Sequence, residues 1–145
     1  MSDWRENILT STDSILDAIR ETRTIAVLGI KPESRSGLPA HYVPEYMAQH
    51  GYEIISVPVY YPEVTEIFGK PVFRKVAAIG RPIDMVNVFR KNYDIPPHVN
   101  DIIDAKPKYV WFQLGIRNNA AAEDLARAGI RVIQDRCLMV DHGRL

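Results

Sequence analysis

One loop of this sequence, GIKPESRSG at positions 29–37, concentrates the residue types that hold phosphate. It begins with a glycine directly after the apolar run TIAVL, where a small residue permits a tight backbone turn. Free N–H groups at the start of a following helix, together with the helix dipole, attract anions. We therefore predict a phosphate-binding loop with contacts from Gly29, Ile30, Lys31, Ser34, Arg35 and Ser36.

The loop departs from the dinucleotide fingerprint G-x-G-x-x-G, because Lys31 and Ser34 stand where the later glycines would be. NAD-binding domains also place Asp or Glu at the end of the second strand, where it binds the ribose hydroxyls. Here the corresponding residues 56–62 are SVPVYYP, without a carboxylate. Both departures count against NAD. A nucleotide with an additional ribose phosphate, such as NADP or coenzyme A, remains compatible with the sequence.

Two later apolar runs end in further candidates. Arg90 and Lys91 can meet a phosphate and Phe89 can pack against an adenine, whereas the structural alternative is a core phenylalanine followed by two solvated cations. Gln113 and the backbone near Gly115 can exchange hydrogen bonds with a ligand amide. The alternative for the glycine is that it serves only the turn.

The C-terminal region contains the residue types of nucleophilic catalysis, Asp135, Cys137 and His142. Their spacing does not place the histidine beside the cysteine, and no companion motif accompanies them. A free cysteine of this kind is typically a small buried side chain. The other histidines lack metal-ligand spacing, so we predict neither a catalytic residue nor a metal site.

Short apolar runs alternate with helical stretches, and this alternation predicts the scaffold for these residues. The runs are apolar at most positions, as in parallel strands that helices bury on both faces. We predict an α/β, Rossmann-like, three-layer α/β/α fold with a five-stranded parallel sheet in the order 3-2-1-4-5. The expected strands are 24–28, 52–57, 83–88, 109–112 and 131–133, and the expected helices are 38–50, a region around 72–78, 96–105 and 118–128.

Ligands of open α/β sheets bind beyond the carboxyl ends of the strands, where the strand order reverses. In the predicted order that reversal lies between the first and fourth strands. We therefore expect the ligand between residues 29–37 and residues 113–118, and next to them at the ends of the second and third strands.

The 145 residues fit a single domain, 1–145, with a leading amphipathic helix in 1–22. The alternative is a shorter helix that begins near Asp13 and is capped by Ser11 or Thr12. In composition, 18 basic residues balance 18 acidic ones, which argues against a protein that grips nucleic acid. A single cysteine excludes an intrachain disulfide.

The acidic N-terminal stretch does not fit a signal peptide. No apolar run approaches the roughly 20 residues that a membrane span needs. We expect a cytoplasmic protein with neither a nucleic-acid nor a membrane partner.

Several segments resemble the family of small stand-alone CoA-binding domains, which is similar to the N-terminal CoA-binding domain of the succinyl-CoA synthetase α chain. The resemblance covers nearly the whole chain. It rests on IAVLG at 25–29, GYEIISVPV at 51–59, IFGKPV at 67–72, IDMVNVFR at 83–90, VWFQLG at 110–115 and DRCL at 135–138.

This resemblance implies that CoA lies across the strand ends, with its phosphates at residues 29–36. The nucleotide end would lie near Pro58 and Phe89–Arg90, and the pantetheine arm would run towards Gln113, Leu114 and Gly115. The synthetase loop is richer in Gly and Thr, so its contacts do not transfer atom by atom, and Glu33 is expected to point away from the phosphate. In the synthetase a second domain brings a phosphorylated histidine to the thiol; we expect no counterpart of it in these 145 residues, so that chemistry is not carried over.

From the sequence we predict a domain that binds coenzyme A or an acyl-CoA non-covalently, without catalytic activity of its own. Two alternatives stay open. One is an NADP-linked or acyl-transfer enzyme, the latter using Cys137. The other is a regulatory subunit whose ligand stabilises a docking surface for a protein partner.

Overall fold

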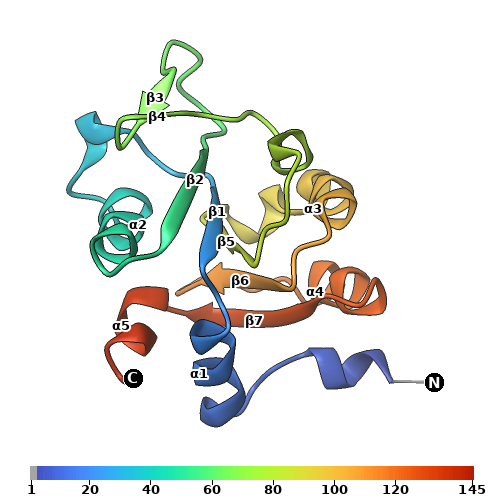
Figure 1. The fold of residues 1–145 in the computed structure, drawn as a ribbon. Coiled ribbons are helices and arrows are strands. Elements are labelled where there is room, and N and C mark those ends of the chain that lie inside the picture. The colour runs from blue at the N-terminus through green and yellow to red at the C-terminus, as the bar shows by residue number, and fades with distance from the viewer. Residues whose placement is uncertain (1–2) are drawn as a thin grey trace.

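The computed structural model describes residues 3–145. At its centre five parallel strands form one sheet, and helices cover both faces (Figure 1). The strands are β1 (Thr24–Leu28), β2 (Glu53–Val57), β5 (Met85–Val88), β6 (Tyr109–Gln113) and β7 (Arg131–Arg136). The predicted Rossmann-like class and the five-stranded parallel sheet are confirmed.

The strand order is β2-β1-β5-β6-β7, which differs from the predicted 3-2-1-4-5 in the place of one strand. The third parallel strand, β5, pairs with β1 on one side and β6 on the other, instead of lying outside β2. All four residues of β5 are buried, as expected of a strand with neighbours on both sides. The order therefore reverses between β1 and β5.

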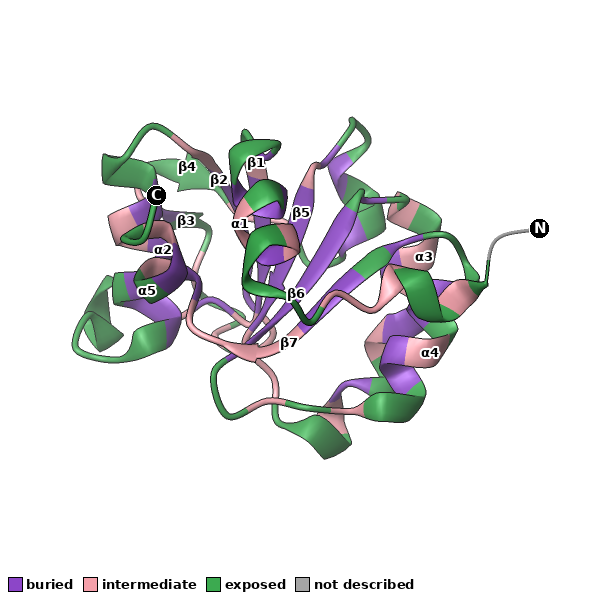
Figure 2. Cartoon of the chain, turned by 90° about the horizontal axis from the view of Figure 1, so that it is seen from below, coloured by how far each residue is buried: buried purple, intermediate pink, exposed green. Residues whose placement is uncertain are grey.

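The helices divide into two groups, one on each face of the sheet. They are α1 (Thr12–Arg20), α2 (Pro39–Gln49), α3 (Val99–Ala105), α4 (Asn119–Arg127) and α5 (Leu138–His142). Alternate strand residues point to opposite faces, so Val27 packs with the core of α1, α2 and α5, whereas Leu28 packs with that of α3 and α4. Figure 2 shows the central strands as predominantly buried between these layers.

The N-terminal segment is not one long helix. A 3-10 turn, Trp4–Asn7, precedes a single parallel bridge from Ile8 to Val132 at the edge of the sheet. The α-helix then begins at Thr12, because the Ser11 side chain accepts a hydrogen bond from the Ser14 amide. The shorter of the two predicted helices is therefore confirmed, and the leading helix over 1–22 is corrected; residues 1–2 lie outside the described residues.

The connection from β2 to β5 contains little helix. Two short antiparallel strands, β3 (Glu66–Ile67) and β4 (Lys70–Pro71), form a hairpin that the sequence did not predict. The helix predicted around 72–78 is only a 3-10 turn, Val76–Ile79, which ends at Gly80 in the left-handed conformation. Within residues 3–145 no helix is both long and apolar enough to cross a membrane.

Candidate ligand-binding cleft

A cleft of about 820 Å³ opens at the carboxyl ends of β1 and β5, where the strand order reverses. Its walls are residues 29–31 and 38–40 after β1, residues 59–61 after β2 and residues 89–94 after β5; residues 115–116 close one end. This volume lies within the range of about 300–1,000 Å³ of small-molecule sites. The position is the one that the rule for open α/β sheets predicts, once the strand order is corrected.

Gly29 forms the floor of the cleft by bringing two loops into contact. Its amide donates to the Val57 carbonyl at 2.9 Å, and the Phe89 amide donates to the Leu28 carbonyl at 2.8 Å. A β-carbon on Gly29 would lie 2.4 Å from the Phe89 carbonyl oxygen, and φ at this residue is +88°. Only glycine fits both the space and the backbone conformation.

The start of α2 faces the cleft and offers amide donors. Within residues 3–145, the amides of Ile30 and Ala40 donate to no protein acceptor. No side chain caps this helix of 11 residues, in which Pro39 occupies the first turn. The amides of Gly29 and Lys31 are already paired, with Val57 and Ala40 carbonyls. Within the predicted phosphate loop and the adjoining helix start, the amides without an acceptor are therefore those of Ile30 and Ala40.

Arg90 brings a nearly buried positive charge to the cleft. Its side chain is 13% exposed, and the buried Nε has no hydrogen-bond acceptor among the described residues. Asp94 lies close, with Oδ2 at 3.8 Å from Nη2, and the Tyr60 ring centre is 5.2 Å from the guanidinium carbon. A buried donor without an acceptor is costly. A phosphate, which guanidinium binds with two parallel hydrogen bonds, would remove that cost.

The charge of Arg90 also acts on His98, which is half-buried before α3. Burial and then the positive charge of Arg90 lower the pKa of this imidazole below its ordinary 6.5, against the opposing charges of Asp101 and Asp94. On the cleft wall itself, three cationic residues, Lys31, Arg90 and Lys91, accompany one acidic residue, Asp94. An excess of positive charge in a cleft favours anions.

Two aromatic rings stand at the mouth of the cleft. Tyr60 is 63% exposed and Tyr93 is 69% exposed, and both residues belong to the cleft wall. The Lys91 ammonium lies 5.9 Å from the centre of the Tyr93 ring. Exposed aromatic faces of this kind stack on nucleobases.

The neighbouring end of β6 is organised differently. Gln113 is 4% exposed, and its Oε1 accepts from Asn87 Nδ2 at 3.3 Å and from the Leu138 amide at 3.4 Å. The Gly115 amide donates to Asp135 Oδ1 at 2.7 Å. The donors named here are thus paired, whereas Asn87 Oδ1 has no partner among the described residues. Gln113 is turned towards α5 rather than into the cleft.

Comparison with known proteins decides the family, because residues 23–143 match the model of the CoA binding domain. The chain belongs to the CoA binding domain family. A curated relative, the uncharacterized protein YneT of Bacillus subtilis (strain 168), is 32% identical over 132 residues, which are 91% of this chain and 94% of that protein. The resemblance inferred from the sequence is confirmed.

Solved structures of similar proteins share this fold. Cell-free ID.343 from Thermus thermophilus is 34% identical with a TM-score of 0.84, covering 93% of this chain and 98% of that one. A hypothetical protein from Pyrococcus horikoshii OT3 is 28% identical with a TM-score of 0.83, covering 94% and 92%. The PH1109 protein redesigned for binding, named Prb, is 27% identical with a TM-score of 0.85, covering 95% and 94%.

In this CoA binding domain, half of the contacts predicted from the sequence lie on the cleft. They are Gly29, Ile30, Lys31, Phe89, Arg90 and Gly115. The other predicted contacts lie elsewhere: Ser34, Arg35 and Ser36 are exposed beyond the cleft wall, Pro58 and Gln113 are buried, and Leu114 points to solvent at 65% exposure. The side chain of Glu33 does not line the cleft and instead accepts from the Phe68 amide.

Sequence reasoning missed several cleft residues, above all Tyr60, Tyr93 and Ala40. Tyr93 follows β5, which lies beside β1 at the reversal only in the observed strand order. Tyr60 follows β2, which is the neighbour of β1 in both orders, so the correction of the order does not explain why it was missed.

The proposed nucleophile and base do not meet. Cys137 is half-buried in the core beneath α1, α2 and α5. His142 instead lies against α2, where its Nδ1 is 2.9 Å from the Tyr46 hydroxyl. Among residues 3–145, no group of three or more His, Cys, Asp or Glu side chains is arranged to hold a metal ion.

Proposed function

We propose that this CoA binding domain binds coenzyme A, or an acyl-CoA, non-covalently in the cleft between β1 and β5. The observation that carries the proposal is the buried Nε of Arg90, a cationic donor without an acceptor at the reversal of strand order. A ligand phosphate supplies the acceptor that this atom lacks. The residues present therefore fit a phosphorylated nucleotide.

Three parts of the cleft each bind a different part of the ligand. Arg90 and the amides of Ile30 and Ala40 bind the phosphates, because these donors are unpaired within the described residues. Tyr60 and Tyr93 stack on the adenine. The pantetheine arm runs towards the end of the cleft at Gly115 and Ile116.

The domain works as a binding module without catalysis of its own, in the cytoplasm where CoA is available. In support, the residues that line the cleft include no adjacent nucleophile and base. When CoA is bound, its thiol and any acyl group supply the chemistry. The protein orients them for an enzyme that acts on the bound or released molecule.

Titration calorimetry tests the proposal with CoA, dephospho-CoA and NADP. CoA should bind, and dephospho-CoA more weakly if Arg90 or Lys31 contacts the 3′-phosphate. Absence of binding at millimolar CoA, or tighter binding of NADP than of CoA, would contradict the proposal. Hydrolysis of acetyl-CoA that disappears in Cys137→Ser would instead identify an enzyme.

A further inference from the structure

The segment of residues 65–74, here called the brace, contacts both walls of the cleft from outside. It consists of the β3–β4 hairpin, extended by a hydrogen bond from the Val72 amide to the Thr65 carbonyl, and the residues up to Arg74. A two-stranded hairpin this short is not stable by itself. Its position depends on contacts with the rest of the domain.

On one side the brace binds the loop after β1. Glu33 Oε2 accepts from the Phe68 amide at 2.9 Å, at a residue whose φ is +55°. The Phe68 ring packs on His41, with ring centres 4.9 Å apart. His41 is 1% exposed and donates from Nδ1 to the Lys31 carbonyl at 2.9 Å. Glu33 and Phe68 thus fix the wall that contains Ile30 and Lys31.

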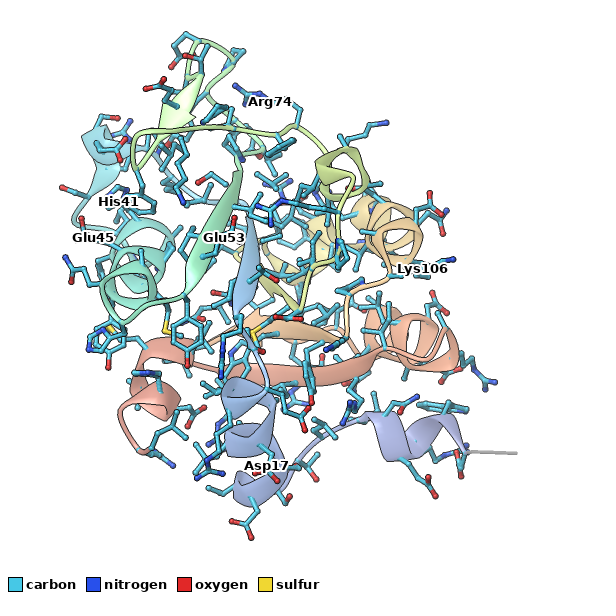
Figure 3. The ribbon with its side chains drawn as sticks, viewed as in Figure 1. Asp17, His41, Glu45, Glu53, Arg74 and Lys106 are labelled. Atoms are coloured by element: carbon cyan, nitrogen blue, oxygen red, sulfur yellow. The ribbon has the colours of Figure 1, made fainter. Side chains whose placement is uncertain are left out.

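On the other side the brace binds the loop after β2. The Arg74 guanidinium (Figure 3) donates to three backbone carbonyls of this loop, those of Tyr60 (3.2 Å), Tyr61 (3.0 Å) and Val64 (2.6 Å). Tyr61 has φ of +65°, a conformation that an aromatic residue keeps only where its surroundings enforce it. The Phe73 amide anchors the brace to the end of β2 through the Ser56 carbonyl at 2.9 Å.

We propose that the brace fixes the loops after β1 and β2 relative to each other, with Glu33 and Arg74 as positioning residues for the ligand. The identity of the ligand rests on the proposed function, whereas the coupling of the two loops does not. Arg74 fixes the backbone of Tyr60, whose ring lies against Arg90 on the far wall. Glu33 fixes the loop that carries the free amide of Ile30. Because one short segment makes both contacts, loosening either one loosens both loops.

Proteolysis tests the mechanics without CoA. Chymotrypsin cleaves after aromatic residues, and Pro62 protects the bond after Tyr61, so the exposed Tyr60–Tyr61 bond reports on the loop after β2. Cleavage at this bond should accelerate in Arg74→Ala and also in Glu33→Ala, although Glu33 contacts the opposite loop. Unchanged cleavage in Glu33→Ala would overturn the inference, because two independent local contacts predict that result.

Affinity provides the second readout. Arg74→Ala and Glu33→Ala should each weaken CoA binding by about tenfold, and the double variant by less than the product of the two effects. Glu33→Gln, which keeps an acceptor oxygen, should recover most of the loss. The matched control is Arg81→Ala, which removes another exposed arginine, one that pairs with Glu53 at β2, and should leave affinity unchanged.

The two proposals fail in different ways. Wild-type protein that binds no CoA contradicts the proposed function, while the cleavage rates still test the brace. If the wild-type protein binds CoA and both variants keep its full affinity, the role of the brace is contradicted while the proposed function stands. The same holds if the affinity losses of the two single variants simply multiply in the double variant.

Discussion

Two adjacent parts of the same sheet edge, the β1–β5 end and the β6–β7 end, differ in whether their polar groups have hydrogen-bond partners. At β6–β7, Gln113 and Asp135 accept hydrogen bonds from neighbouring backbone. At β1–β5, the Nε of Arg90 is buried without an acceptor, and the start of α2 has no side-chain cap. Polar residues at the edge of a sheet are therefore a weak sign of binding by themselves. What distinguishes the cleft is that its donors lack partners within the domain.

The largest contrast is expected between two glycines. Gly29→Ala forces a β-carbon to 2.4 Å from the Phe89 carbonyl oxygen, whereas a β-carbon at Gly115 meets nothing within 4 Å. Both residues have positive φ, so both variants carry the backbone strain of about 1–2 kcal/mol. Gly29→Ala should lose at least about 3 kcal/mol of unfolding free energy, measured in urea, because overpacking adds to the strain. Equal losses at the two positions would refute the close contact.

The second contrast separates affinity from stability. Arg90→Gln should weaken CoA binding by about 10–100-fold, as expected for losing a hydrogen bond to a charged group, with little loss of folding stability. Gln113→Leu should do the reverse and destabilise the fold by about 1–3 kcal/mol, because the Leu138 amide loses its acceptor. Calorimetry and urea unfolding measure both variants. Arg127→Gln, at an exposed arginine near the end of α4, is the control for removal of an arginine.

A smaller effect is expected at Asp94, which competes with a ligand phosphate for Arg90. Its carboxylate lies 3.8 Å from the guanidinium and is partly exposed. Asp94→Asn removes a weak ion pair with Arg90 and a negative charge that repels the ligand phosphate. CoA should therefore bind about two- to fivefold more tightly, within the range of surface ion pairs. Weaker binding in this variant would show that the carboxylate supports the ligand rather than competing with it.

The smallest effect concerns pH. Burial and the charge of Arg90 lower the pKa of His98 in the folded protein, so the unfolded chain binds a proton more readily. This contribution to stability is complete above the ordinary pKa of 6.5 and is lost as the pH falls through the lowered value. His98→Gln should make unfolding free energy less dependent on pH between about pH 5 and 7. A steeper dependence in that variant would contradict the assignment.

Near-continuous apolar runs such as the one at β5 were enough to predict the parallel sheet. The strand order could not be predicted from these runs, because both possible orders obey the same rule for right-handed crossovers. The choice depends on which strand occupies the centre, and only the structure shows that all four residues of β5 are buried there. Placing β5 beside β1 gives the loop after β5, with Arg90 and Tyr93, more weight than residues 113–118.

Other parts of the site had weaker signals in the sequence. The period of two along β6 places Gln113 on the same face as the buried Trp111, so its inward direction was predictable. The brace was not predictable from the sequence, because its strands have only two residues each. The positive φ of Tyr61 and Phe68 was equally hidden, since these residue types rarely adopt it.

A crystal structure of the protein with coenzyme A tests the central claim most directly. The account predicts a phosphate oxygen within hydrogen-bond distance of Arg90 Nε and of the Ile30 or Ala40 amide. A ligand bound instead at the β6–β7 end, with that nitrogen still lacking an acceptor, would contradict it.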